Sequence, residues 1–190
     1  MNERELTADF GAVLDANVLA NLPVCDLLLR LAETPRLYIP FFSEELITEA
    51  ERTHRKLNWP ENLVQSFSSA LRAHFPESLV TYPPALPQTF TNDPKDRHVL
   101  AAAVASKSEV IVTFNLKHFR AKDLAPWGVE AQHPQDFLLS LYDLKGPRVF
   151  VCLSEMAIKR RKDLAQVLGA LKKYIPTFAE QVAADLSLLL

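Results

Sequence analysis

Residues 93–115 read DPKDRHVLAAAVASKSEVIVTFN. Asp93–Pro94 is typical of a helix start, with a capping residue followed by a first-turn proline. Apolar residues then recur at helical spacing, at Val99, Leu100, Ala103 and Val104. The run 110–113 that follows is short, apolar and β-branched, as in a buried strand. A helix that leads directly into a buried strand is the repeating unit of α/β folds.

The same alternation extends on both sides of this stretch. Strands are expected at residues 11–15, 37–41, 79–81, 110–113 and 129–131, and helices at 43–54, 60–75, 93–106 and 134–144. Such alternation predicts a parallel sheet sandwiched by helices, a three-layer α/β/α fold. This first domain is expected to span residues 1–145.

A helical extension is expected over residues 146–190, with helices at 149–162, 163–174 and 176–190. The last of these carries an amphipathic stripe formed by Phe178, Val182, Leu186 and Leu189. An apolar stripe needs a cover. We therefore expect the extension to pack on the first domain or to form an interface, either with a second copy of the chain in a homodimer or with a partner protein.

Composition excludes several kinds of site. The chain has 190 residues but only 4 Gly, which are widely separated, and this spacing excludes the glycine-rich loops that bind nucleotide phosphates. The net charge of −2 provides no global basic field, so any contact with nucleic acid must be local. Cys25 and Cys152 lie in apolar surroundings and are expected to be buried thiols rather than a disulfide.

The cytoplasm is the expected location, with no membrane segment. The first residues, MNERELTADF, lack the apolar core of a signal peptide. The longest apolar runs fall far short of the ~18 residues that span a bilayer.

Carboxylates close or follow the predicted strands. Asp15 ends the first strand, where it serves either a ligand site or the cap of the next helix. Asp96 lies on the apolar face of its helix, and a carboxylate there is costly without a partner. Asp93 is better explained as a helix cap.

Further polar groups are expected at the same edge of the sheet. Thr113 and Asn115 follow the strand at 110–113, and Glu49 lies on the helix after the second strand. Carboxylates gathered in one place repel unless a hard cation such as Mg²⁺ neutralises them. The sequence therefore predicts a metal site that can activate water against a phosphodiester.

Four motifs, in this order and spacing, resemble the PIN-domain ribonucleases, especially the VapC-like toxins of bacterial toxin–antitoxin pairs. They are VLDANVL (13–19), SEELITEAE (43–51), DPKDRHVLAAAV (93–104) and VTFNLKHF (112–119). The resemblance covers about residues 10–142. It implies a metal-dependent endoribonuclease with a parallel sheet between helices, acting as a growth-restraining toxin held by a small antitoxin.

The resemblance also implies which residues form the site. Asp15, Glu49 and Asp96 match the acids that bind Mg²⁺ or Mn²⁺, with Glu45 as a rival of Glu49, and Asn17 and Thr113 match supporting polar neighbours.

The fourth acidic position holds Asn115, which would assist or orient water. A neutral amide weakens cation binding, so the number of metal ions in the site, one or two, stays open. Asp123 is an acid close enough in sequence to compensate.

Basic residues beside Asn115 suit contact with RNA phosphates, namely Lys117, His118 and Arg120. Phe114 and Phe119 would either stack on unpaired bases or be buried.

Two other functions stay open. One is a haloacid-dehalogenase-like phosphatase with Asp15 as nucleophile, although Asn17 stands where that family has a second Asp. The other is a non-catalytic PIN-fold module that binds RNA or protein.

Overall fold

A five-stranded parallel sheet lies at the centre of the fold. The computed structural model describes residues 10–187, and in this part of the chain the strand order is β3-β2-β1-β4-β5. The strands are β1 (Gly11–Leu14), β2 (Ile39–Ser43), β3 (Leu79–Val80), β4 (Val110–Val112) and β5 (Glu130–Gln132). Every neighbouring pair is parallel. The predicted α/β class with a parallel sheet is therefore confirmed.

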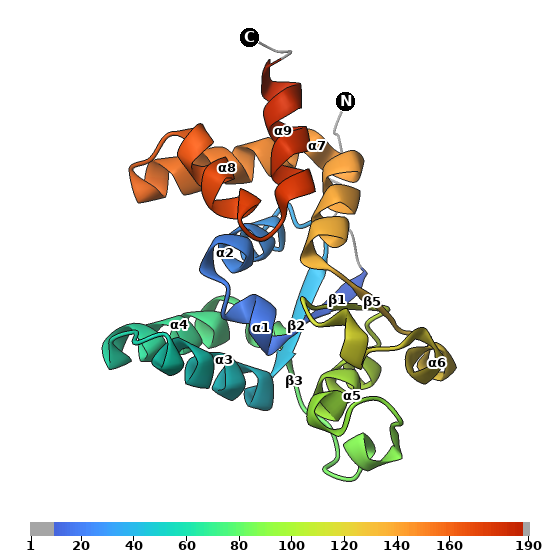
Figure 1. Cartoon of the computed structure of the whole chain (residues 1–190). Helices are drawn as coiled ribbons and strands as arrows, with labels where there is room; N and C mark the ends of the chain where they lie inside the picture. Colours follow the sequence, from blue (N-terminus) through green and yellow to red (C-terminus); the bar gives the residue numbers. More distant parts are fainter. Residues whose placement is uncertain (1–9, 188–190) are drawn as a thin grey trace, which may run out of the picture.

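Helices lie on both sides of this sheet (Figure 1). They are α1 (Ala16–Leu19), α2 (Leu22–Leu31), α3 (Glu44–Lys56), α4 (Glu61–His74), α5 (Arg97–Ser106), α6 (Ala121–Leu124), α7 (Pro134–Arg160), α8 (Leu164–Lys172) and α9 (Pro176–Ser187). Short 3-10 turns lie between them, including η3 (Pro94–Asp96) and η4 (Leu116–His118). Helix α5 packs against β1, β2 and β4, while α7 packs against α2.

The largest error in the predicted strand boundaries is at the second strand, and the others differ by one residue. The second strand was expected at residues 37–41, but β2 runs from Ile39 to Ser43. Leu37 donates its backbone N–H to the Leu31 carbonyl at 2.8 Å, so it closes the end of α2 instead of joining the sheet. At the other end, the Ser43 side chain accepts a hydrogen bond from the Leu46 N–H and caps α3.

The order of the strands fixes where a ligand can bind. From β1 the chain builds outward through β2 and β3, and then returns to the other side of β1 to build β4 and β5. The carboxyl ends of β1 and β4 therefore flank a topological switch point, which is where open parallel sheets bind ligands. Asp15 follows β1 and Thr113 follows β4 at this point.

Gly11 lies at the opposite, amino end of β1. A Cβ at this position would lie 2.8 Å from Cε2 of Phe41 and 2.9 Å from Oγ of Ser108. Side chains of β2 and of the loop before β4 therefore leave room only for a hydrogen atom.

The chain bends where the first domain was expected to end. Lys145 interrupts α7 with non-helical angles (φ −149°, ψ 58°), two residues before Pro147. The hydrophobic core continues beyond this kink, because buried residues of α7–α9 such as Leu153 and Phe178 belong to the same cluster as the sheet. The domain division at residues 145 and 146 stays a prediction.

The other expectations for the extension can be placed as well. Phe178 and Val182 of the amphipathic stripe are buried, and Leu189 lies outside the described residues. Cys25 and Cys152 are free, buried thiols, as predicted. Among the described helices, none combines the length and apolar character needed to cross a lipid bilayer.

Candidate active site

Asp15 occupies the residue between β1 and α1, and its side chain is turned into the fold. Its backbone carbonyl accepts the first hydrogen bonds of α1, from Val18 and Leu19. Its carboxylate, however, makes no capping bond. Asp15 is therefore the N-cap residue of α1 by position, as the cap alternative had it, but its carboxylate is used elsewhere.

The Asp15 carboxylate is held by two neutral groups. The Thr113 hydroxyl donates to its Oδ2 at 2.6 Å, and Asn17 Nδ2 donates to the same oxygen at 2.5 Å. Asn17 also accepts a hydrogen bond from the Phe114 N–H through Oδ1. Residues 15–17 and 113–114 are thereby joined across the switch point.

Burial without a countercharge perturbs this carboxyl group. Asp15 is only 3% exposed, and no cationic side chain between residues 10 and 187 forms an ion pair with it. Burial, helped by the charges of Asp96 and Glu49 and opposed by the Thr113 hydrogen bond, raises the pKa of Asp15 to about 6. The three acids therefore interact electrostatically.

Glu49 reaches the site from α3. Its carboxylate lies 3.2 Å from Nε2 of His98, which lowers the pKa of Glu49. Burial acts to lower the pKa of His98, but Glu49 and the other nearby carboxylates raise it above its ordinary value. Glu45, one turn earlier, instead accepts a hydrogen bond from the Tyr82 hydroxyl at 3.0 Å.

Asp96 lies at the junction of η3 and α5. Its side chain makes no capping bond and instead contacts Nδ1 of His118 at 2.6 Å. Asn115 Nδ2 lies 2.6 Å from the same ring nitrogen. Asp93, as predicted, caps its turn by accepting from the Lys95 N–H, and it lies 3.9 Å from Nε2 of His118.

These side chains share one hollow, which we call the acid cleft. Its volume is about 600 Å³, and its lining includes Asp15, Asn17, Glu49, Trp59, Asp96, Asn115 and Tyr174. Glu45 is not among the lining residues. The structure thus brings Asp15, Glu49, Asp96 and Asn115 together, with Thr113 directly behind Asp15.

Aromatic side chains also line the acid cleft, but not those that the sequence suggested. Phe119 is buried in the core, and Phe114 packs against His133. The cleft is instead lined by Trp59, whose ring stacks on His54 at 3.9 Å, and by Tyr174, which is 45% exposed. Tyr174 comes from the linker between α8 and α9, so the extension contributes to the cleft.

The basic residues after Asn115 lie beside the acid cleft. Lys117, His118 and Arg120 line a separate hollow of about 260 Å³, which we call the side pocket, together with Thr91, Asn92, Asp93, Pro94 and Arg97. Asp123 does not substitute for the missing fourth acid, because it forms an ion pair with Arg120 at 2.7 Å and accepts a hydrogen bond from Thr91.

Some of these partners were not found from the sequence. Contact between His118 and Asp96 was missed, although His118 stands one 3-10 turn after Asn115, and this spacing was a usable signal. Contact between His98 and Glu49 joins two helices, and Tyr174 is distant in sequence from every other cleft residue. These two features had no local signal.

The donor set of the acid cleft fits a hard divalent cation. It consists of carboxylate oxygens from Asp15, Glu49 and Asp96 with one amide from Asn115, and such cations prefer oxygen ligands. The buried Asp15 carboxylate, which lacks a cationic partner among the described residues, is the strongest structural sign of this fit.

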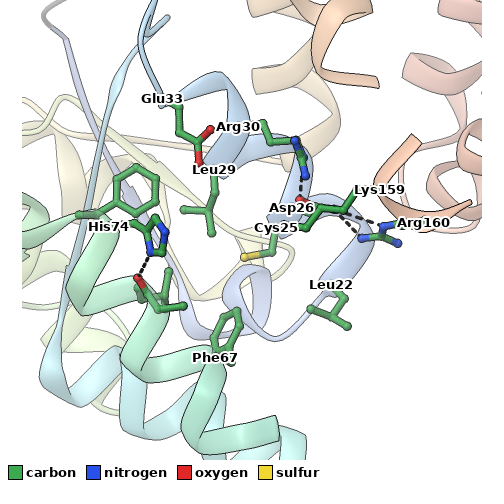
Figure 2. A pocket seen from close by; sticks show the side chains of 13 residues that line it. Leu22, Cys25, Asp26, Leu29, Arg30, Glu33, Phe67, His74, Lys159 and Arg160 are labelled. Carbon is green, nitrogen blue, oxygen red and sulfur yellow. Dashed lines mark hydrogen bonds and ion pairs between the residues drawn. The ribbon is translucent and has the colours of Figure 1, made fainter. Parts of the chain in front are cut away.

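A third hollow contrasts with the acid cleft. It lies between α2, α4 and the end of α7, and its volume is about 510 Å³ (Figure 2). Asp26 on its wall forms ion pairs with Arg30 at 2.9 Å and with Arg160 at 2.7 Å. We call it the Asp26 pocket. The charge of Asp26 is thus neutralised by the protein itself.

Fold and site together define an α/β protein with an acidic cleft at the switch point of a parallel sheet. The family profile described as "PIN domain" matches residues 11–117, which is more than half of the chain. The chain therefore belongs to the PIN-domain family, as its motifs predicted.

A relative is found in Mycobacterium tuberculosis, where it is named "Putative ribonuclease VapC50". The two sequences are 44% identical over 91 residues, which cover 46% of this chain and 54% of the relative. The chain thus spans about half the length of the curated relative that it matches. No solved structure matches the chain.

Proposed function

We propose that this protein is a divalent-metal-dependent endoribonuclease. The observation that carries the proposal is the buried Asp15 carboxylate, which has no cationic partner among residues 10–187 and shares the acid cleft with Glu49 and Asp96. Membership of the PIN-domain family and the name of the relative support the same reading.

Asp15, Glu49 and Asp96 are the proposed ligands of Mg²⁺ or Mn²⁺. When bound, such an ion lowers the pKa of a water and neutralises charge on a phosphodiester. Asn115 supplies a neutral amide at the fourth position, which favours one tightly bound ion over two. The position of Glu49 in the cleft, where Glu45 is absent, supports Glu49 as the second acid.

The remaining polar residues position these ligands. Thr113 and Asn17 hold one oxygen of Asp15 in place. His118 holds Asp96 and lies within hydrogen-bonding distance of Asn115, which is the candidate to orient the attacking water. Partners of this kind commonly change metal affinity or activity by about 10- to 100-fold.

Single-stranded RNA is the proposed substrate form. Trp59 and Tyr174 line the acid cleft, and aromatic rings bind unpaired bases by stacking. Stacking is available only for bases that are not enclosed in a duplex, so cleavage is expected in unpaired regions.

The proposed biological role is that of a toxin in the cytoplasm, restrained by a small antitoxin protein. This role rests on the resemblance of the motifs to VapC-like toxins and on the relative's name. Association of two copies of the chain is part of the same proposal.

A cleavage assay tests the activity. We expect a labelled single-stranded RNA to be cut internally with Mg²⁺ or Mn²⁺, to remain intact with EDTA, and to be cut again when metal is restored. A hairpin of the same composition should be cut in its loop. RNA binding without cleavage at any metal concentration would favour the non-catalytic module. A trapped phosphoryl group on Asp15 would favour the phosphatase.

A further inference from the structure

The side pocket next to the acid cleft has the chemistry of an anion site. Arg97 and Lys117 both line it, and neither forms an ion pair with a carboxylate within the part of the chain that the structure describes. Arg120 adds a third cation, although Asp123 neutralises it, and Asp93 adds one negative charge. The lining therefore keeps a net positive charge.

Asn92 gives independent evidence for a ligand. It lines the side pocket, it is only 1% exposed, and neither its Nδ2 nor its Oδ1 has a hydrogen-bond partner. Buried polar groups nearly always have partners, and leaving one unsatisfied is costly. Its backbone carbonyl accepts from Arg97 Nε at 3.3 Å, so the residue is held beside that guanidinium.

The side pocket is joined to the acid cleft through one side chain. His118 lines the side pocket and contacts both Asp96 and Asn115, which line the acid cleft. A polyanion that enters the acid cleft can therefore extend past His118 into the side pocket. The repeating anion of such a chain is a phosphodiester.

We propose that the side pocket binds an RNA backbone phosphate next to the one that is cleaved. Lys117 and Arg97 supply the charge, and Asn92 Nδ2 supplies a hydrogen bond. This inference rests on the proposed function for its ligand, but the pocket itself is defined by its own residues. It assigns to Arg97 and Asn92 a binding role that the sequence motifs did not indicate.

The first test is the salt dependence of RNA binding, measured by fluorescence anisotropy with a short single-stranded RNA in EDTA. For single strands, the slope of log affinity against log salt is negative, and each lost phosphate contact reduces its magnitude by about 0.7. Lys117→Gln should make the slope less steep by this amount. Lys162→Gln makes the same charge change at an exposed residue beyond α7 and should leave the slope unchanged. An unchanged slope for Lys117→Gln would overturn the proposal.

The second test does not depend on nuclease activity. Inorganic phosphate is titrated into phosphate-free protein, and the side-chain NH₂ signals of Asn92 are followed by NMR. We expect a saturable shift in the wild type, a weaker one in Lys117→Gln, and the wild-type shift in Lys162→Gln. The proposal fails if Asn92 does not respond, or if Lys117→Gln responds like the wild type.

The two tests separate the two proposals. A protein that cuts RNA but keeps its salt slope in Lys117→Gln has the proposed activity without this subsite. A protein that cuts no RNA, while phosphate shifts Asn92 and Lys117→Gln weakens that shift, lacks the activity and has the anion site. If phosphate shifts Asn92 but the RNA slope stays unchanged, the pocket takes free phosphate and the RNA assignment is wrong.

Discussion

Asp15 and Asp26 are carboxylates in two different hollows of the molecule, and they differ in burial and in the charge of their partners. Asp26 receives ion pairs from Arg30 and Arg160, and its side chain is 25% exposed (Figure 2). Asp15 is almost fully buried and receives only neutral hydrogen bonds from Thr113 and Asn17. The countercharge of Asp26 is supplied by the chain itself, whereas no cationic side chain among residues 10–187 forms an ion pair with Asp15.

The comparison teaches how to separate a structural acid from a ligand-binding acid. A paired carboxylate contributes to stability through its partners, and removing it leaves those partners exposed or unpaired. An unpaired buried carboxylate costs stability in the free protein, which makes it a candidate for binding a cation. The C-terminal extension touches both hollows, through Arg160 in one and Tyr174 in the other.

The largest expected difference is in RNA cleavage. Asp15→Asn should lower the cleavage rate by at least about 100-fold, the upper end of the loss caused by removing even an indirect partner of a metal. Asp26→Asn removes a charge of the same kind and should stay within about two-fold of the wild type, since surface changes away from the site are small. Rates are measured with saturating Mg²⁺ on one RNA. Equal losses of cleavage rate in both variants would contradict the distinction between a ligand-binding Asp15 and a structural Asp26.

The second difference is in the stability of the metal-free protein, which the two substitutions should change in opposite directions. Asp15→Asn should raise the free energy of unfolding at pH 7.5 by about 1–3 kcal/mol, because a pKa near 6 means that folding disfavours the charged form. Asp26→Asn should lower it by about 1 kcal/mol, the scale of a partly exposed ion pair. Urea unfolding in EDTA measures both.

The pH dependence sharpens this stability test. The folded wild type holds the Asp15 proton up to about pH 6, whereas the unfolded chain releases it near pH 3.8. The wild type should therefore lose stability as the pH rises from about 4 to 6, and Asp15→Asn should lack this loss. The gap between the two proteins should be absent below pH 4. A gap of constant size at all pH values would contradict the assignment.

Glu49 and Glu45 offer the same comparison within one helix. Glu49→Gln should weaken Mg²⁺ binding by about ten-fold, because Glu49 lines the acid cleft. Glu45→Gln makes the same change one turn earlier, where the side chain binds Tyr82, and should leave metal binding intact. Calorimetric titration with Mg²⁺ compares them. If Glu45→Gln has the larger effect, the second ligand has been assigned to the wrong turn.

The smallest expected effect concerns Tyr174. Tyr174→Ala should weaken binding of single-stranded RNA roughly five-fold, which corresponds to about 1 kcal/mol for one stacked base. Tyr174→Phe keeps the ring and should bind like the wild type. Anisotropy in EDTA measures binding without cleavage. If both variants lose affinity equally, the hydroxyl rather than the ring makes the contact.

Much of this arrangement could be predicted from the sequence, because it depends on strand ends. Asp15 and Thr113 each follow a short apolar run, and parallel strands bring such positions to one edge. Asp96 could be predicted as a site residue because a carboxylate on an apolar helix face needs a partner. The position of β2 was missed by two residues, since the tertiary hydrogen bond of Leu37 to the end of α2 has no signal in local periodicity.

The remaining errors arise from contacts between distant segments. Phe114 and Phe119 were plausible stacking residues by proximity to Asn115, but Phe119 is needed to fill the core. Trp59 and Tyr174 line the cleft because α3 ends beside it and the extension folds back to it. Neither position follows from residue type or spacing, because each depends on how separate helices pack.

Gly11 is a position at which the amount of folded protein could be changed without changing the acid cleft. It lies at the amino end of β1, and Asp15 follows the carboxyl end of the same strand. A methyl group at Gly11 would press on the Phe41 ring, and such overpacking commonly costs about 1–3 kcal/mol. We therefore expect Gly11→Ala to behave as a temperature-sensitive variant: warming would reduce the number of folded molecules, while each folded molecule would keep an unaltered acid cleft.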